Sequence, residues 1–232
     1  MCIRDSTENA NSLVGDGREL DLLFQFDLMD MDGEGSKWNA IPLDVPKLKR
    51  IVAAWQGAID WNTLFLGNHD QPRVVSRFGD TSSEELWKRS AKCLATLMYL
   101  QRGTPFIYQG EELGMTNAPF ETREQLRDVE ELNLLALCSS EAELEWAWRG
   151  IKAKGRDNAR TPMQWSAGAN AGFTTGEPWI MLNPNYTDIN AEAEEGDPDS
   201  VLNYYRALIA LRDSTPALLR GDWRELLPES GQ

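Results

Sequence analysis

Cysteine and histidine are scarce in this sequence, and their scarcity argues against two kinds of protein. Only three cysteines occur in 232 residues, Cys2, Cys93 and Cys138, and no two of them are closely spaced. A disulfide-stabilised framework and a cysteine-ligated zinc site are therefore not expected. The single histidine is His69, and no other spacing of residues suggests a ligand set for a metal. We expect reduced thiols, no metal and no cofactor.

Long apolar runs and an excess of positive charge are also missing. No window approaches the roughly 18 consecutive apolar residues that a membrane helix needs, and residues 1–5 contain no stretch typical of a signal peptide. The 37 acidic residues outnumber the 23 basic residues, which gives a formal net charge of −14. This charge repels polyanions but does not penalise a neutral ligand such as a sugar. We expect a cytoplasmic protein with no membrane or nucleic-acid partner.

The composition that remains, 41% hydrophobic and 26% charged, is that of a globular domain, and its apolar residues alternate between two periods. Short apolar runs predict strands at Leu20–Met29, Trp61–Leu66 and Thr104–Tyr108. Apolar residues spaced three and four apart predict helices at Val45–Ile59 and from Thr81 to Gly103. The order strand, helix, strand, helix, strand is typical of βαβ units, so we expect an α/β fold with a parallel sheet.

Polar turns follow the second and third predicted strands, at Gly67–Asp70 and Gln109–Glu112. Because parallel strands present their carboxyl ends at one edge of a sheet, both turns should face a shared site. Residues 117–200 form a long insertion with acidic helical segments. Helical spacing returns at Asp199–Arg212, and Gly221–Leu227 looks like the start of a strand in a part of the protein that this chain does not include.

Asn68-His69-Asp70 is the first candidate site, although an Asn-His-Asp tripeptide after a strand also suits an ordinary turn. The longer string Phe65–Asp80 (FLGNHDQPRVVSRFGD) is more specific. It closely resembles a signature region of the α-amylase superfamily of glycoside hydrolases, in its oligo-1,6-glucosidase and α-glucosidase branch. Two further blocks continue the resemblance, Gly103–Asn117 (GTPFIYQGEELGMTN) and Gly155–Trp165 (GRDNARTPMQW), the second followed by AGFTT.

The resemblance runs from about Asn9 to Gln232 and implies part of a (β/α)8 TIM barrel. The three predicted strands would be its sixth, seventh and eighth strands, with a long loop after the eighth. We expect residues 1–8 to be an unmatched leader and residues 9–220 to be the carboxy-terminal half of the catalytic barrel. Residues 221–232 would then begin a carboxy-terminal β domain.

The same resemblance implies a division of catalytic roles. Enzymes of this branch use a nucleophilic Asp and an acid/base Glu whose carboxyl groups lie roughly 5 Å apart. Both belong to earlier strands, so no residue of this chain is assigned to either role. By position in the motifs, Asp70 is the third carboxylate, which stabilises the transition state. His69 is a ligand to glucose hydroxyls, and Arg156 helps to fix the terminal glucose, with its carboxylate partner expected upstream.

Four further residues have side chains that could act in a sugar-binding site, but we interpret them as structural. Glu111 and Glu112 look like an acid and base pair, but the resemblance implies that they brace the loop after the eighth strand. Arg160 is interpreted as loop scaffolding, and Trp165 as a buried anchor rather than a platform for a sugar ring.

The expected activity of the full-length protein is retaining hydrolysis of α-glucosidic bonds from the non-reducing end, preferably α-1,6 bonds in isomalto-oligosaccharides. The fragment alone should be inactive and fold poorly, because half a barrel leaves sheet edges exposed. One alternative is a trehalose-6-phosphate hydrolase, which would need Arg or Lys clusters to bind the phosphate. Another is a non-catalytic amylase-like domain, such as the ectodomain of the heavy chains that accompany amino-acid transporters.

Overall fold

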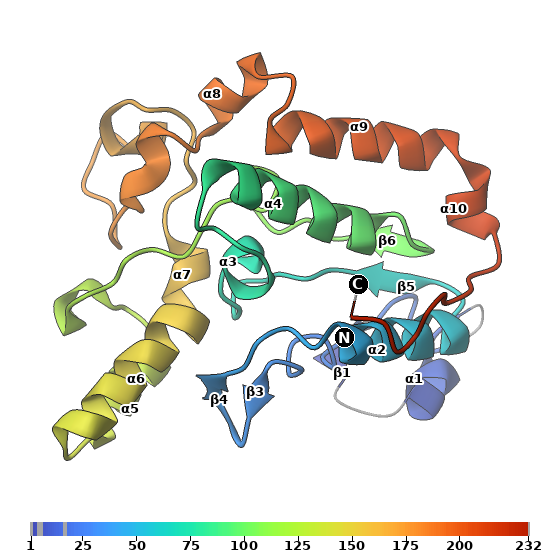
Figure 1. Cartoon of the computed structure of the whole chain (residues 1–232), viewed down its shortest axis with the longest axis horizontal. Coiled ribbons are helices and arrows are strands. Elements are labelled where there is room, and N and C mark those ends of the chain that lie inside the picture. The colour runs from blue at the N-terminus through green and yellow to red at the C-terminus, as the bar shows by residue number, and fades with distance from the viewer. Residues whose placement is uncertain (1, 4–6, 16–17, 232) are drawn as a thin grey trace.

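Helices dominate the chain, and its strands are short (Figure 1). The computed structural model describes residues 2–3, 7–15 and 18–231. The strands are β1 (Cys2–Ile3), β2 (Phe24–Gln25), β3 (Gly33–Glu34), β4 (Ser36–Ala40), β5 (Asn62–Leu64) and β6 (Gly103–Pro105). The α-helices are α1 (Thr7–Leu13), α2 (Val45–Ala58), α3 (Val74–Phe78), α4 (Glu84–Tyr99), α5 (Val129–Leu137), α6 (Glu141–Lys154), α7 (Asp157–Arg160), α8 (Ala191–Gly196), α9 (Val201–Ser214) and α10 (Pro216–Arg220). Among these helices, none combines the length and the apolar character that crossing a membrane requires.

The strands β5 and β6 confirm the predicted parallel pairing across a helical crossover. Asn62 pairs with Gly103 and Leu64 with Pro105, while α4 connects the two strands. The pairing continues one residue further, since Phe106 N–H donates to the Leu64 carbonyl at 2.9 Å. Gly103 has a φ of +146°, and a Cβ there would lie 2.3 Å from the Asn62 carbonyl oxygen. Only glycine permits this close approach of the two strands.

The first predicted strand is much shorter than expected. Only Phe24–Gln25 of the run Leu20–Met29 is a strand, and it pairs in parallel with β1. Within the described residues no ladder joins β2 to β5, so the three predicted strands do not form one continuous sheet. They still lie together, because the Phe24 ring packs edge-on against Phe65 and Phe106 at centroid distances of 5.1 and 4.7 Å. The α/β class is therefore correct.

Two helices form as the apolar spacing predicts, and both have side-chain caps. Asp44 accepts a hydrogen bond from Lys47 N–H at the start of α2, and Ser83 accepts one from Leu86 N–H at the start of α4. Their apolar faces contribute to the main core, which also contains residues of β5 and α9. The buried residues of α2 and α4 in this core are Leu48, Val52, Trp87, Ala91, Leu94, Ala95, Met98 and Tyr99.

The long insertion folds as helices around a second, smaller core. The helices α5 and α6 pack together, and α6 also packs against β4. Trp38 of β4 meets Phe120, Leu135 and Ile151 in this core. A helix-packed scaffold therefore carries the residues of α7, which would otherwise lie in a long loop.

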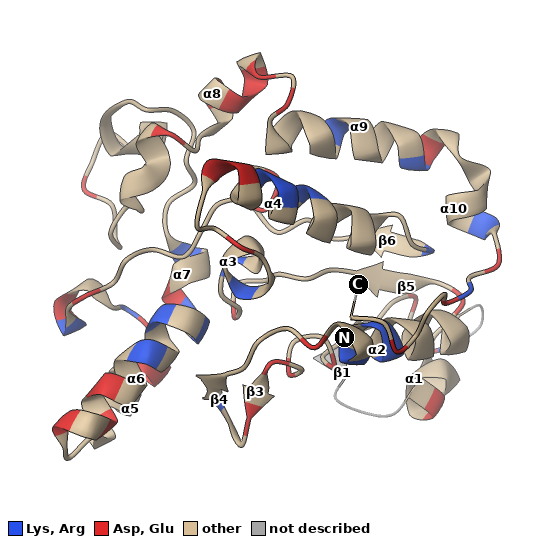
Figure 2. Cartoon of the chain, viewed as in Figure 1, with Lys and Arg blue, Asp and Glu red and all other residues tan. Residues whose placement is uncertain are grey.

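Acidic residues gather at the starts of several helices (Figure 2). Glu84 and Glu85 occupy the first turn of α4, and Glu141 and Glu143 occupy the first turn of α6. Negative charge is favourable at these positions because the amino-terminal end of a helix carries partial positive charge. Part of the net negative charge therefore stabilises helices.

The carboxy-terminal residues do not form the predicted strand. After α9 and α10, residues 221–231 are irregular, and no strand pairs with them in the described part of the chain. Leu226 and Leu227 are both more than 70% exposed. A strand needs hydrogen-bond partners along its edge, and the described residues provide none for Gly221–Leu227, so the strand does not form within this chain and the further β domain stays a prediction. Of the expected leader, residues 1 and 4–6 lie outside the described residues.

Candidate active site

Asp70 lies in the turn that follows β5. Asn68 shapes this turn, because its Oδ1 accepts a hydrogen bond from Asp70 N–H at 2.8 Å. The Asp70 carboxylate is 42% exposed, and its Oδ2 lies 3.3 Å from His69 Nε2. The predicted pair therefore stands at the carboxyl end of a strand, where a solute can reach both side chains.

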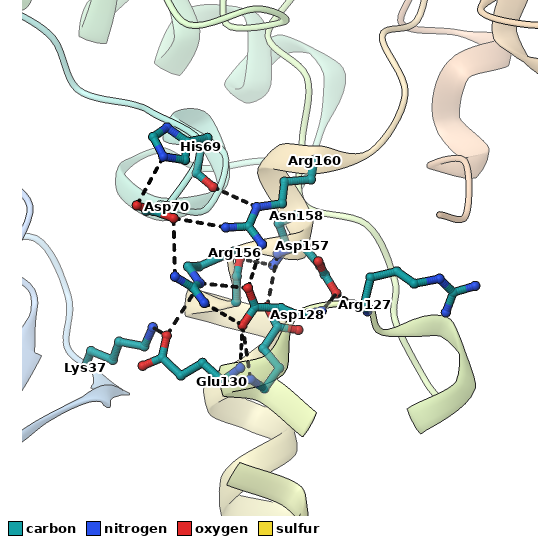
Figure 3. Close-up of polar contacts among 12 residues, drawn as sticks. Lys37, His69, Asp70, Arg127, Asp128, Glu130, Arg156, Asp157, Asn158 and Arg160 are labelled. Atoms are coloured by element: carbon teal, nitrogen blue, oxygen red, sulfur yellow. Dashed lines mark hydrogen bonds and ion pairs between the residues drawn. The ribbon is translucent and has the colours of Figure 1, made fainter. Parts of the chain in front are cut away.

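Two arginines from α7 and its start approach the same oxygen of Asp70 (Figure 3). Asp70 Oδ1 lies 3.4 Å from Arg156 and 3.0 Å from Arg160. Arg160 also donates from Nε to the His69 carbonyl at 3.0 Å. The structure thus brings the three predicted residues together and adds Arg160. Interpreting Arg160 only as loop scaffolding missed its direct contact with Asp70.

Asp128 holds both arginines from the opposite side. Its Oδ2 lies 2.8 Å from Arg156 Nε and 2.6 Å from an η nitrogen of Arg160. Burial alone would raise the pKa of Asp128, but the hydrogen bond and charge of Arg156, together with the backbone N–H groups of Glu131 and Glu130, outweigh it, so the pKa is lowered. The same bond raises the pKa of Arg156. Two carboxylates and two guanidinium groups therefore form a closed, charge-balanced ring, which we call the Asp–Arg ring (Asp70, Asp128, Arg156, Arg160).

The partner of Arg156 is expected upstream of this chain, which stays a prediction, but the structure also supplies a partner within the chain, Asp128. Asp128 was not identified from the sequence, because it reads as an ordinary helix cap. It does cap α5, accepting hydrogen bonds from Glu130 N–H at 2.8 Å and Glu131 N–H at 3.3 Å. An aspartate shortly before two glutamates is typical of a helix start, so the sequence gives no separate indication that Asp128 also binds two arginines.

An open hollow of about 350 Å³ borders Asp70 and Arg156. Lys37, which also lines it, pairs with Glu130, and Glu130 Oε2 lies 3.5 Å from Arg156 Nε. Lys154 lines another part of the hollow and pairs with the buried Asp32. Burial lowers the pKa of Lys154 to about 8, with the charge of Arg77 adding to the effect. The cations around the hollow thus have carboxylate partners.

Glu111 and Glu112 make the contacts expected of bracing residues. Glu111 Oε1 accepts hydrogen bonds from the Tyr99 hydroxyl at 2.6 Å and the Tyr205 hydroxyl at 3.0 Å, which ties the turn after β6 to α4 and α9. Burial raises the pKa of Glu111 to about 7. Glu112 Oε2 accepts from Gly110 N–H within the turn itself. Neither glutamate lines the hollow beside Asp70.

The exposure of Trp165 decides the expectation for that residue. Trp165 is 51% exposed, so the prediction that it is a buried anchor was wrong. Its backbone, rather than its ring, holds the loop, because Trp165 N–H donates to the Ala171 carbonyl at 2.9 Å. Cys93 and Cys138 are free thiols. In the ranges that the structure describes, no group of three or more His, Cys, Asp or Glu residues is arranged to hold a metal.

Comparison with known proteins gives a consistent family. The family model of the alpha amylase catalytic domain matches residues 3–221. A probable oligo-1,6-glucosidase of Bacillus subtilis is 48% identical over 94% of this chain and 40% of its own length. The oligo-1,6-glucosidase of Bacillus cereus is 46% identical over 96% of this chain and 41% of its own length. The chain thus spans about two fifths of the length of these relatives.

A solved structure shows the same arrangement of the backbone. The trehalose-6-phosphate hydrolase of Bacillus licheniformis superposes with a TM-score of 0.93 at 41% identity, over 99% of this chain and 42% of that protein. Its identity is high enough that the likeness reflects common descent as well as a shared fold. With the match of the family model to most of the sequence, the chain belongs to the family of alpha amylase catalytic domains.

Proposed function

We propose that this chain is the carboxy-terminal part of the catalytic (β/α)8 barrel of a retaining α-glucosidase. In this proposal β2, β5 and β6 are the sixth, seventh and eighth barrel strands. Residues 9–220 belong to the barrel and its loops, and residues 221–232 begin a carboxy-terminal β domain. The parallel pairing of β5 with β6 and the polar turns at their carboxyl ends support this assignment.

One observation carries the functional proposal: the Asp70 carboxylate stands half-exposed at a hollow, between two arginines and beside His69. Glycoside cleavage passes through an oxocarbenium-like transition state, in which positive charge develops on the sugar ring. A fixed carboxylate stabilises that charge, and donors that bind sugar hydroxyls keep the ring in place. In the complete enzyme Asp70 takes the first role, while His69 and Arg156 bind hydroxyl groups.

The covalent chemistry belongs to residues that this chain does not supply. A nucleophilic Asp attacks the anomeric carbon while a Glu protonates the leaving oxygen, and water then hydrolyses the glucosyl-enzyme with the same Glu acting as base. The fragment alone is therefore inactive. Its contribution is to hold the glucose and to stabilise the charge that develops on it.

The charge around the hollow favours a neutral substrate, and we propose α-1,6-linked glucose oligomers. Lys37, Lys154 and Arg156 line it, and each forms an ion pair with a carboxylate. A phosphate would have to compete with those carboxylates for each cation. The likeness to trehalose-6-phosphate hydrolases nevertheless makes a phosphorylated disaccharide the second candidate.

The test uses the complete enzyme and its Asp70→Asn variant, assayed on isomaltose, maltose and trehalose 6-phosphate. We expect the wild-type enzyme to prefer isomaltose and the variant to lose at least about 100-fold in kcat, the cost of removing one group that stabilises a transition-state charge. A clear preference for trehalose 6-phosphate would replace the proposed substrate. Failure of the wild type on every sugar would favour the non-catalytic amylase-like domain.

A further inference from the structure

Two fully buried carboxylates lie behind the Asp–Arg ring. Glu131 is in the first turn of α5, and Asp157 is the first residue of α7. Both residues have an exposed fraction of 0%. Neither forms an ion pair with an arginine of the ring, so the site geometry described above does not use them directly.

Their hydrogen bonds cross between the two segments. Glu131 Oε1 accepts from Asp157 N–H at 3.0 Å. Asp157 Oδ2 in turn accepts from Arg127 N–H at 2.6 Å and Asp128 N–H at 2.9 Å. Each segment thus holds the backbone of the other through one carboxylate oxygen. We call this pair the carboxylate clasp (Glu131 and Asp157).

The backbone atoms that the clasp holds belong to residues of the ring or to their immediate neighbours. The N–H group of Asp128, a residue of the ring, donates to Asp157. The N–H group that donates to Glu131 belongs to Asp157, the residue directly after Arg156 in the chain. On the other side of Arg156, a Cβ on Gly155 would lie 2.7 Å from Glu131 Oε1. The Glu131 carboxyl therefore packs against the chain on both sides of Arg156.

We propose that Glu131 and Asp157 are positioning residues, which fix the offset between α5 and α7 and thereby hold Asp128 against Arg156, the arginine that faces Asp70. This inference rests on the proposed function of the Asp–Arg ring. It follows from the hydrogen bonds that Glu131 and Asp157 accept from each other's segments. Moving α7 relative to α5 would break the bonds of both residues. Small misplacements of a binding group cost catalysis heavily, so such a device has a measurable effect.

Stability alone is a poor explanation for this pair. Glu131 Oε2 and Asp157 Oδ1 are buried and have no hydrogen-bond partner among the described residues. Unsatisfied buried oxygens are costly, and apolar residues of similar size would avoid that cost. Burial also raises the pKa of Glu131 to about 8, an effect to which the charges of Asp157 and Asp128 add. Glutamine is therefore a close mimic of the protonated Glu131 side chain at neutral pH.

Glu194 provides a matched control in the same chain. It is 5% exposed, burial raises its pKa to about 7, and one of its oxygens also lacks a partner. Its Oε2 accepts a hydrogen bond from Leu202 N–H at 2.9 Å, so it too holds a backbone group with one oxygen. It secures α9, however, and touches no residue of the ring.

The experiment compares Glu131→Ala, Glu131→Gln and Glu194→Ala in the complete enzyme by Tm and by kcat and KM on isomaltose. We expect Glu131→Ala to lower kcat/KM by about 100-fold, the effect of misplacing a positioned group by about 1 Å. Glu131→Gln should keep kcat/KM close to the wild-type value, since the glutamine carbonyl oxygen can accept a hydrogen bond from Asp157 N–H. Glu194→Ala should lower Tm without changing KM. Equal losses of Tm with unchanged kcat/KM in both alanine variants would overturn the proposal.

Two further measurements cover the case in which Glu131→Ala does not fold and the case in which the wild-type enzyme is inactive. If Glu131→Ala does not fold, Glu131→Asp shortens the side chain by one methylene and withdraws its oxygen from Asp157 N–H. If the wild type hydrolyses no α-glucoside, the proposed function fails, and the clasp is then tested by a crystal structure of Glu131→Asp. The proposal expects the 2.8 Å contact between Arg156 and Asp128 to lengthen, and an unchanged contact would overturn it.

Discussion

Replacing Asp128 tests whether one carboxylate performs two separable tasks. Its Oδ2 pairs with Arg156 at 2.8 Å and Arg160 at 2.6 Å, and its Oδ1 caps α5 by accepting from Glu130 N–H at 2.8 Å. Asp128→Asn keeps an oxygen for the cap but removes the charge, whereas Asp128→Ala removes both. The difference between the two variants therefore isolates the cap.

The magnitudes follow from burial. Removing one partner of a fully buried ion pair costs about 3 to 5 kcal/mol, because the other charge is left uncompensated. The Asp128 side chain is 1% exposed, but both arginines are 24% exposed, so water compensates part of the loss. We expect Asp128→Asn to cost about 2 to 3 kcal/mol on that basis. Loss of the cap adds about 1 kcal/mol for Asp128→Ala.

Urea denaturation of the complete enzyme from pH 3 to pH 8 measures these values. Because the folded pKa of Asp128 lies below its usual value of 3.8, its ionised form contributes stability above the unfolded pKa. That contribution is lost as the pH falls through the lowered folded pKa. The difference in free energy of unfolding between wild type and Asp128→Asn should therefore disappear only in strong acid. A gap below about 1 kcal/mol at pH 7, the value typical of exposed pairs, would refute the reasoning.

Two further predictions concern the clasp and the turn beside it. Since burial raises the folded pKa of Glu131 to about 8, wild-type stability should fall as the pH rises from about 4.3 to 8, and Glu131→Gln should lack this slope in thermal melts across that range. Gly155→Ala should cost about 1 to 3 kcal/mol in urea denaturation, because its Cβ would meet the Ile151 carbonyl oxygen at 2.5 Å. Gly57→Ala in α2 meets nothing within 4 Å and should instead stabilise by about 0.5 kcal/mol; similar changes for both glycines would contradict the steric argument.

The sequence predicted those parts of the fold whose causes are local. Apolar spacing and a capping residue define α2 and α4, and both helices begin close to the expected residue. The run Leu20–Met29 has the composition of a strand, but a strand also depends on partners that lie elsewhere in the chain. Only Phe24–Gln25 has such a partner in the described structure. Gly221–Leu227 likewise has no partner strand among the described residues.

The same distinction between local and long-range causes applies to the candidate site. His69 and Asp70 are neighbours in one turn, so a motif could identify them together. Asp128 and Arg160 are separated by 32 residues, and their contact depends on how the α5–α6 hairpin folds back. Residue types alone gave no sign of this pairing, because Asp128 has the features of a helix cap and Arg160 was interpreted as loop scaffolding.

Asp128 has a further consequence for the proposed reaction. Without it, Asp70 would be the main counter-charge of both guanidinium groups, with Glu130 3.5 Å from Arg156 alone, and their combined positive charge would weaken the attraction of Asp70 for a developing cation. Asp128 is buried and binds both arginines at shorter distances than Asp70 does. It therefore neutralises much of their charge away from the hollow, where Asp70 Oδ2 stays free of either arginine and lies beside His69. The arginines can then orient a sugar and Asp70 without cancelling the negative charge that the transition state requires.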